Sequence, residues 1–151
     1  MIFYELFVAR KAMEIIMIEM KGYKINSLEF ENKVENGTQL KLQNHVKYNV
    51  NYIDSENRCV GILHFRVEDA DMQPFEINLE MAAEFSFENT DEKPDIHVES
   101  FDQLFPFVRQ IINNTTSMAG MPGLMIPMMK LNRDTVAVGK PENNDDGEML
   151  N

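Results

Sequence analysis

Three segments of the chain alternate strictly between apolar and polar residues, and this alternation constrains the fold more than any other feature. In residues 75–87, FEINLEMAAEFSF, every odd-numbered residue is apolar and glutamates recur at the even positions. Residues 40–52 alternate in the same way, broken only by Asn44, and residues 59–67 form the third such run. A period of two over this length predicts strands that bury one face and expose the other.

The links between these runs are short, and they predict how the strands pair. The connections around residues 54–57 and 70–74 are typical of antiparallel neighbours. A further strand is expected over roughly residues 18–30, followed by a turn at Asn36-Gly37. The sequence therefore predicts a four-stranded antiparallel sheet.

From Ser100 onward the apolar residues take the spacing of one helical face. They are Phe101, Leu104, Phe105, Val108, Ile111, Ile112 and Thr115. Ser100 with Gln103 forms a candidate capping box, and Pro106 fits only in a first turn, so the helix is expected to begin at Ser100 or slightly later. Residues 120–123, GMPG, are expected to end it. The predicted fold class is α+β, with one long helix packed on one face of the sheet.

One helix is too narrow to cover such a sheet. A single helix covers about two of the strands, so apolar surface is left over. Partner subunits commonly cover a remainder of this kind. The sequence alone therefore predicts an oligomer.

The composition fits a single cytoplasmic domain. A chain of 151 residues with 44% hydrophobic residues is long enough for one core. Cys59 is the single cysteine, which excludes an internal disulfide and fits a reducing compartment. The apolar N-terminus is interrupted by Glu5, Arg10 and Lys11, so neither a signal peptide nor a membrane span is expected.

The net charge of −11 is concentrated in the middle third of the chain. Residues 54–102 hold three basic against fourteen acidic residues, whereas the two flanking thirds are close to neutral. An acidic field of this kind repels phosphate, so nucleic acid is not an expected partner. The alternative interpretation is a charge that serves solubility alone.

Two motifs resemble the SecB family of export chaperones. Residues 104–109, LFPFVR, resemble the Leu-Phe-Pro-Tyr-Ala-Arg motif that opens the main helix of that family. Residues 121–127, MPGLMIP, resemble the Phe-Pro-x-Leu-x-Leu-x-Pro segment that follows it. Fifteen residues separate Pro106 from Pro122, as in the family's pattern. Ser27-Leu28-Glu29-Phe30-Glu31 falls at the family's Asp-x-Ser-Phe-Glu segment.

The resemblance implies a cytoplasmic, ATP-independent chaperone for protein export that holds unfolded or precursor polypeptides and is not an enzyme. It implies a homotetramer built as a dimer of dimers, with no cofactor and no integral membrane association. The SecA translocation motor is a candidate partner. The chaperone domain is expected over residues 17–139, between an N-terminal extension of unknown role at 1–16 and a disordered acidic tail at 140–151. The family's second helix is expected to be absent or short, because the sequence after Pro127 lacks helical apolar spacing.

Resemblance and composition together predict an apolar client-binding groove on the helix and the segment after it. Five methionines within residues 118–129 suit a site that repacks around different partners. The alternative is that they fill the core of an oligomer. The residues expected to contact clients are Phe101, Phe105, Phe107, Met121, Leu124, Met125 and Met128.

In the SecB family, acidic residues on the exposed face of the sheet dock SecA. The residues expected to form this motor-docking face here are Glu29, Glu31, Glu76 and Glu80. Ser27 and Asn78 stand where the family has acidic residues, which weakens the predicted docking. The alternative is a solvated face balanced by Lys41 and Lys47 on a neighbouring strand.

Motifs for catalysis or metal binding are not evident in the sequence. His45, His64 and His97 lie on separate segments without ligand spacing, and residues 118–123 lack the Gly-Lys-Ser/Thr ending of a phosphate loop. Two alternatives to the export role stay open. One is a dedicated SecB-like chaperone of a toxin–antitoxin system, and the other is a structural oligomer that does not bind clients.

Overall fold

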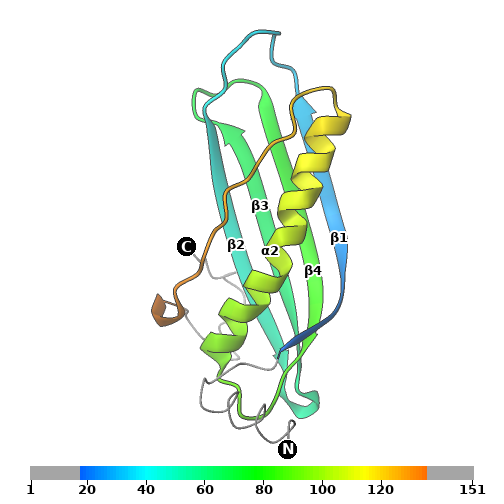
Figure 1. Cartoon of the computed structure of the whole chain (residues 1–151), viewed down its shortest axis with the longest axis vertical. Coiled ribbons are helices and arrows are strands. Elements are labelled where there is room, and N and C mark those ends of the chain that lie inside the picture. The colour runs from blue at the N-terminus through cyan, green and yellow to red at the C-terminus, as the bar shows by residue number, and fades with distance from the viewer. Residues whose placement is uncertain (1–17, 136–151) are drawn as a thin grey trace, which may run out of the picture.

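The computed structural model describes residues 18–135, which form a sheet with a helix across one face (Figure 1). The predicted extension at 1–16 and acidic tail at 140–151 lie outside the described residues. The elements are β1 (Glu19–Asn32), β2 (Leu42–Ile53), β3 (Arg58–Asp69), β4 (Phe75–Ser86), the helix α2 (Lys93–Met118), and the 3-10 turns Asp54–Glu56 and Arg133–Thr135.

The four strands are antiparallel in the order β1-β4-β3-β2, which confirms the predicted α+β class. The strands β2, β3 and β4 follow one another in the sheet, as their short links predict. β1 pairs with β4, so β1 and β2 form the two edges. The turn after β3 is fixed by the buried carboxylate of Asp69, which accepts backbone hydrogen bonds from Lys41, Asp71 and Gln73.

β1 contains two irregularities that bring its apolar residues onto the helix face of the sheet. Its register against β4 shifts between Met20 and Gly22 and again between Ile25 and Ser27. Each shift inserts one extra residue, so the residues opposite the buried positions of β4 are spaced by three and two in turn. They are Met20, Tyr23, Ile25, Leu28 and Phe30, followed by the polar Asn32 opposite Phe75. β1 thus presents an apolar face although its sequence does not alternate cleanly.

α2 begins at Lys93, well before the predicted start at Ser100. Pro94 occupies the first turn, where a missing N–H leaves no helical hydrogen bond unmade. The first turns bury His97 and Ser100, polar residues that an apolar periodicity cannot reveal. The helix ends at Met118, just before residues 120–123, as the sequence predicts.

Ser100 and Pro106 have roles that correct the predicted helix start. The buried Ser100 hydroxyl does not cap the helix, because it accepts a hydrogen bond from the Tyr48 hydroxyl at 2.6 Å and donates one to the His97 carbonyl at 3.0 Å. Pro106 lies inside the helix and not in its first turn. Pro106 is exposed, so its ring lies on the solvent side of the helix and does not enter the core.

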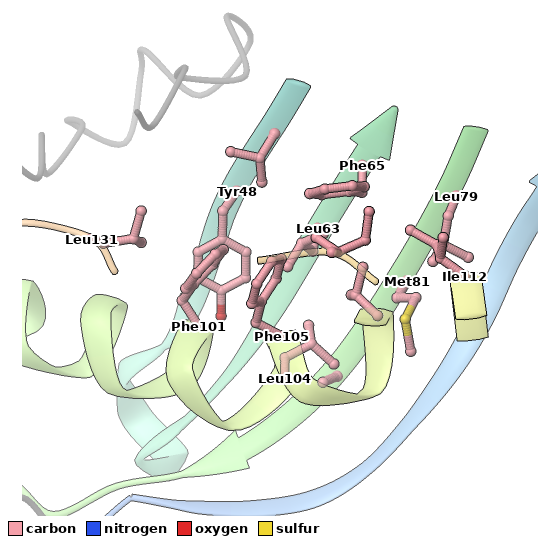
Figure 2. Packing of buried hydrophobic residues seen from close by; sticks show 14 of the residues in the cluster. Tyr48, Leu63, Phe65, Leu79, Met81, Phe101, Leu104, Phe105, Ile112 and Leu131 are labelled. Atoms are coloured by element: carbon pink, nitrogen blue, oxygen red, sulfur yellow. The ribbon is translucent and has the colours of Figure 1, made fainter. Parts of the chain in front are cut away.

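The core lies between α2 and the buried faces of the strands (Figure 2). Every odd-numbered residue from 59 to 69 and from 75 to 85 is buried, as the alternation predicts. The rings of Phe101 and Phe105 stack at 5.1 Å between centroids, and Phe105 contacts Phe65 of β3 at 5.8 Å. Figure 2 shows Leu104 of the same helix pointing into this layer.

Gly61 of β3 makes room for the Tyr48 ring of β2. A Cβ atom at Gly61 would lie 2.2 Å from the Tyr48 hydroxyl oxygen. The Tyr48 ring is fully buried and packs edge-on against His97 at 5.0 Å and Phe101 at 5.5 Å. Burial raises the pKa of Tyr48 and lowers the pKa of His97 to about 4, so both rings are neutral at pH 7 and add no buried charge.

We expect Gly61→Ala to lower the free energy of unfolding by about 1–3 kcal/mol, because the added methyl group displaces the Tyr48 ring from a packed core. Gly22→Ala in β1 is the matched control, since a Cβ atom there meets no other atom within 4 Å. Urea unfolding of both variants measures the difference. Equal stability of the two would show that Gly61 does not set the position of Tyr48.

Candidate functional site

An extended segment follows α2 and runs back along it (Figure 1). The chain leaves the helix through Gly120, whose φ of +89° favours glycine. Residues 121–131, the return segment, lie on the β2 side of α2 and bury Ile126 and Leu131 in the core. The return segment therefore covers part of the sheet that α2 leaves open.

Polar side chains of α2 hold the backbone of the return segment. The Arg109 guanidinium donates to the Ile126 carbonyl at 2.6 Å, and the Asn113 amide donates to the Leu124 carbonyl at 3.3 Å. The Leu124 N–H donates to the Thr116 hydroxyl at 2.8 Å. Because the return segment is not part of the sheet, these side chains supply hydrogen bonds that a neighbouring strand would otherwise make.

The chain is attached to α2 at both ends of the helix. Near the end of α2, Gly123 packs so closely that an added Cβ atom would lie 2.5 Å from the Ser117 hydroxyl oxygen. Near the start of α2, Arg133 forms ion pairs with Glu92 and Asp95. The return segment is thus stretched along the helix and cannot move away at one end without breaking contacts.

Three of the five methionines in this region are largely exposed. Met118, Met125 and Met128 are 86%, 74% and 52% exposed, whereas Met121 and Met129 are partly buried against the core. Unbranched, polarisable methionine side chains adapt to partners of different shape. The return segment therefore presents an adaptable apolar surface to solvent.

The aromatic residues predicted to contact clients divide into two groups. Phe101 and Phe105 are fully buried between α2 and the sheet, which corrects the expectation that they form part of an open surface. Their spacing is that of the core-facing side of α2, so core packing accounts for both. Phe107 is partly buried at the other side of the helix, where its ring lies 4.6 Å from that of Tyr23.

A second exposed apolar surface lies on the sheet edge formed by β1. Tyr23, Ile25 and Leu28, the edge strip, are 39% to 45% exposed on the helix face of that strand. α2 contacts this side through the Phe107 ring, which lies against Tyr23. Sequence reasoning missed the edge strip because the two register shifts hide its alternation. The spacing of three and two from Met20 to Phe30 is the signal that could have identified it.

The acidic residues predicted to form a docking face do lie on one side of the sheet, opposite α2. In the β1–β4 register, Glu31 lies opposite Glu76 and Ser27 lies opposite Glu80, with Glu29 between them. The structure therefore brings the four glutamates of two strands together. One of them, Glu80, also accepts a hydrogen bond from the Asn26 side-chain amide of β1 at 2.9 Å.

The charge balance on this face differs from the alternative interpretation, in which Lys41 and Lys47 offset the glutamates. Arg66 of β3 lies 3.7 Å from Glu76 of β4. Lys47, which was expected to balance the glutamates, lies opposite His64 instead, and Lys41 precedes β2. The reason is the strand order, because β3 separates β2 from β4. Arginines of β3 thus take the place of the expected lysines.

The titratable groups of the described residues do not form a metal-binding cluster. Within residues 18–135, no three His, Cys, Asp or Glu side chains converge to hold a metal ion. Burial raises the pKa of the Cys59 thiol to about 12, so this sulfur is protonated and unreactive at pH 7. His45 contacts the carboxylate of Glu68 at 2.8 Å. None of the described helices is long and apolar enough to span a membrane.

Comparison with a curated relative decides the family. The chain is 31% identical over 147 residues to the protein-export protein SecB of Jannaschia sp. (strain CCS1), and the match covers 85% of each chain. The chain belongs to the SecB family. No protein-family model matches the sequence.

Solved structures confirm the SecB-like fold. A SecB-like chaperone of Mycobacterium tuberculosis, in complex with a ChAD peptide from the HigA1 antitoxin, has a TM-score of 0.61 at 13% identity. That match covers 81% of this chain and 92% of the other. A protein of unknown function from Streptococcus agalactiae has a TM-score of 0.51 at 16% identity, over 75% of this chain and 98% of that one.

Membership in the SecB family supports a chaperone role and confirms that the chain is not an enzyme, because the family is non-enzymatic. Within residues 119–135, the 3-10 turn Arg133–Thr135 is the one helical element. The prediction that the family's second helix is absent or short stays a prediction for residues 136–151, which lie outside the described residues.

Proposed function

We propose that this SecB-family protein is a cytoplasmic, ATP-independent chaperone of the protein-export type, which holds extended apolar segments of unfolded polypeptides. The exposed methionines of the return segment are the observation that carries the proposal, because apolar side chains grouped on one exposed segment mark an interaction site, whereas single exposed ones do not. SecB of Jannaschia, the relative at 31% identity, supports the export role.

The client surface is proposed to comprise Met121, Leu124, Met125 and Met128 of the return segment, with Phe107 as a separate contact on the β1 side of α2, beside the edge strip. Each well-buried Met, Leu or Phe side chain contributes about 1.5–3 kcal/mol before the costs of association and ordering are subtracted, so several contacts along the return segment are needed together. Contacts of this kind need no fixed client sequence. Adaptable methionines would let one site accept many clients.

We expect Met125→Asp combined with Met128→Asp to weaken binding of a reduced, unfolded protein by about tenfold or more, because each Asp would be buried against the client without a partner. Met72→Asp is the matched control: Met72 is 91% exposed but lies at the β3–β4 turn. Client binding and suppression of aggregation without nucleotide are measured. Unchanged affinity in a folded double variant would mean that clients bind at another site. If the wild type itself does not bind unfolded protein, the alternative of a structural oligomer without client binding is favoured.

We further propose a homotetramer built as a dimer of dimers, with the edge strip in the contact between two copies. Three observations support this contact. The edge strip is apolar, it lies on a strand that forms one edge of the sheet within residues 18–135, and α2 leaves it partly open. A second copy would cover the strip and extend the sheet.

Ile25→Glu should raise the dissociation constant of the oligomer by about tenfold or more, since a buried carboxylate would lack a partner. Ser27→Glu adds the same charge to the opposite face of β1 and is the matched control. Light scattering over a concentration series measures both. If the wild type is monomeric at millimolar concentration, or if the two variants dissociate alike, the proposed contact is wrong.

The acidic face is proposed to bind a cationic segment of a partner such as the SecA motor, weakly and with strong dependence on salt. Glu29, Glu31, Glu76 and Glu80 lie together on β1 and β4, but Ser27 and Asn78 dilute the charge between them. Exposed ion pairs contribute less than about 1 kcal/mol each, so a few such pairs give weak docking. Long-range attraction persists at low salt.

Glu29→Gln with Glu80→Gln should reduce the affinity for the basic C-terminal segment of SecA about three- to tenfold at low ionic strength. Glu35→Gln with Glu88→Gln removes the same net charge from loops beyond the strands and should have less effect. Titration calorimetry at low and physiological salt distinguishes the two. If both double variants lose affinity equally, the attraction depends on net charge and not on this face. If the wild type does not bind even at low salt, the acidic face is a solvated surface without a docking role.

A dedicated chaperone of a toxin–antitoxin system is the second candidate function. It is favoured by the likeness to the M. tuberculosis SecB-like chaperone, which was solved with an antitoxin peptide, and by Ser27 and Asn78 on the docking face. In that case the return segment would bind one antitoxin segment much more tightly than general unfolded proteins.

A further inference from the structure

Two of the exposed methionine sulfurs each lie against a hydrogen-bond donor of α2. The Met128 Sδ atom is 2.9 Å from Arg109 Nη1, and the Met125 Sδ atom is 3.3 Å from Asn113 Nδ2. The same two donor side chains also bind backbone carbonyls of the return segment. Arg109 and Asn113 are one helical turn apart, so the contact is repeated along the helix. Arg109 and Asn113 thus each contact the return segment at two points: a backbone carbonyl oxygen and a methionine sulfur.

A thioether is a weak acceptor, and these donors are therefore poorly matched to the sulfurs they contact. A sulfoxide oxygen accepts hydrogen bonds strongly, and a guanidinium donor strengthens such a bond by its charge. Met125 and Met128 are also open to solvent oxidants, at 74% and 52% exposure. The Arg109 and Asn113 donors would therefore form stronger hydrogen bonds with the sulfoxides of Met125 and Met128 than with their thioethers.

We propose that Met125 and Met128 form a reversible oxidation site that turns client binding off. A peroxide delivers one oxygen atom to each thioether: its O–O bond breaks, an S–O bond forms, the sulfur loses two electrons, and the peroxide leaves as water or an alcohol. In the reverse step a dithiol reduces the sulfoxide to the thioether, and the products are water and a disulfide.

Oxidation would act on the client surface in two ways. It replaces the apolar, adaptable side chains by polar ones, so less apolar surface is buried against a client. It also gives Arg109 and Asn113 strong acceptors, which ties the return segment more firmly to α2. The core is not disturbed, because both side chains lie outside it. This inference rests on the proposed chaperone function for its consequence but not for its chemistry.

The experiment uses the full chain, treated with hydrogen peroxide until mass spectrometry of peptides shows sulfoxide at Met125 and Met128. The wild type is compared with Met125→Leu/Met128→Leu and with Met72→Leu, and each protein is compared with its own untreated sample. Met72 is a fully accessible methionine at the β3–β4 turn and reports oxidation outside the site. Two readouts are taken: hydrogen exchange of residues 121–131, and affinity for a reduced, unfolded protein.

Oxidised wild type and oxidised Met72→Leu should exchange more slowly within residues 121–131 and bind the client at least tenfold more weakly than their untreated samples. Treatment with methionine sulfoxide reductase should restore both properties. The leucine double variant should show neither change.

Unchanged or faster exchange in oxidised wild type would overturn the proposal whether or not clients bind. Equal loss of client affinity in the double variant would also overturn it. Absence of client binding before oxidation would contradict the chaperone function, and the exchange readout would still decide the oxidation site.

Discussion

The packing of one helix across a wider sheet is the constraint on which the rest of the structure depends. A helix is about 10 Å across, whereas adjacent strands are spaced by about 4.8 Å, so α2 cannot cover all four strands. On the β2 side, the return segment fills the gap with Ile126 and Leu131. On the β1 side, the edge strip stays partly open. Both apolar surfaces follow from the width of the sheet.

The two faces of the sheet are suited to different kinds of partner. The helix face is apolar, and its two uncovered margins can bury side chains against a client or a second copy. The opposite face carries glutamates interspersed with arginines, for example Arg58 paired with Glu84. Such a face gains little from burial but attracts a cationic partner over a distance. Binding events on the two faces therefore need not compete for the same residues.

The sequence predicts most of the fold because period-two alternation survives where the strands are regular. β3 and β4 bury every second residue, and their register follows from short turns. The buried face of β1 could not be predicted in this way, because two extra residues interrupt its alternation. The start of α2 could not be predicted for another reason: His97 and Ser100 face the core, and their burial depends on contacts with Tyr48 from a distant strand. Strand order, which decides that β3 supplies the arginines, is likewise not encoded locally.

The candidate site could be predicted only in part, since composition identifies residues but not the side that each one faces. The five methionines are evident in the sequence, yet nothing local distinguishes exposed Met125 from partly buried Met129. Phe105 and Phe107 belong to the same motif at residues 104–109, and helical spacing separates them: Phe105 faces the sheet, whereas Phe107 lies beside Tyr23.

The extended form of the return segment accounts for its exposed methionines. A helix or a strand would satisfy its own backbone and could bury one regular face. The return segment instead depends on a few α2 side chains, and between those contacts its residues must either insert into the core or project outward. Ile126 inserts, and the neighbouring Met125 and Met128 project. Methionine suits the projecting positions because its flexible side chain stays apolar without requiring a fixed neighbour. A surface that can receive varied partners thus results from a segment that is held at only a few points.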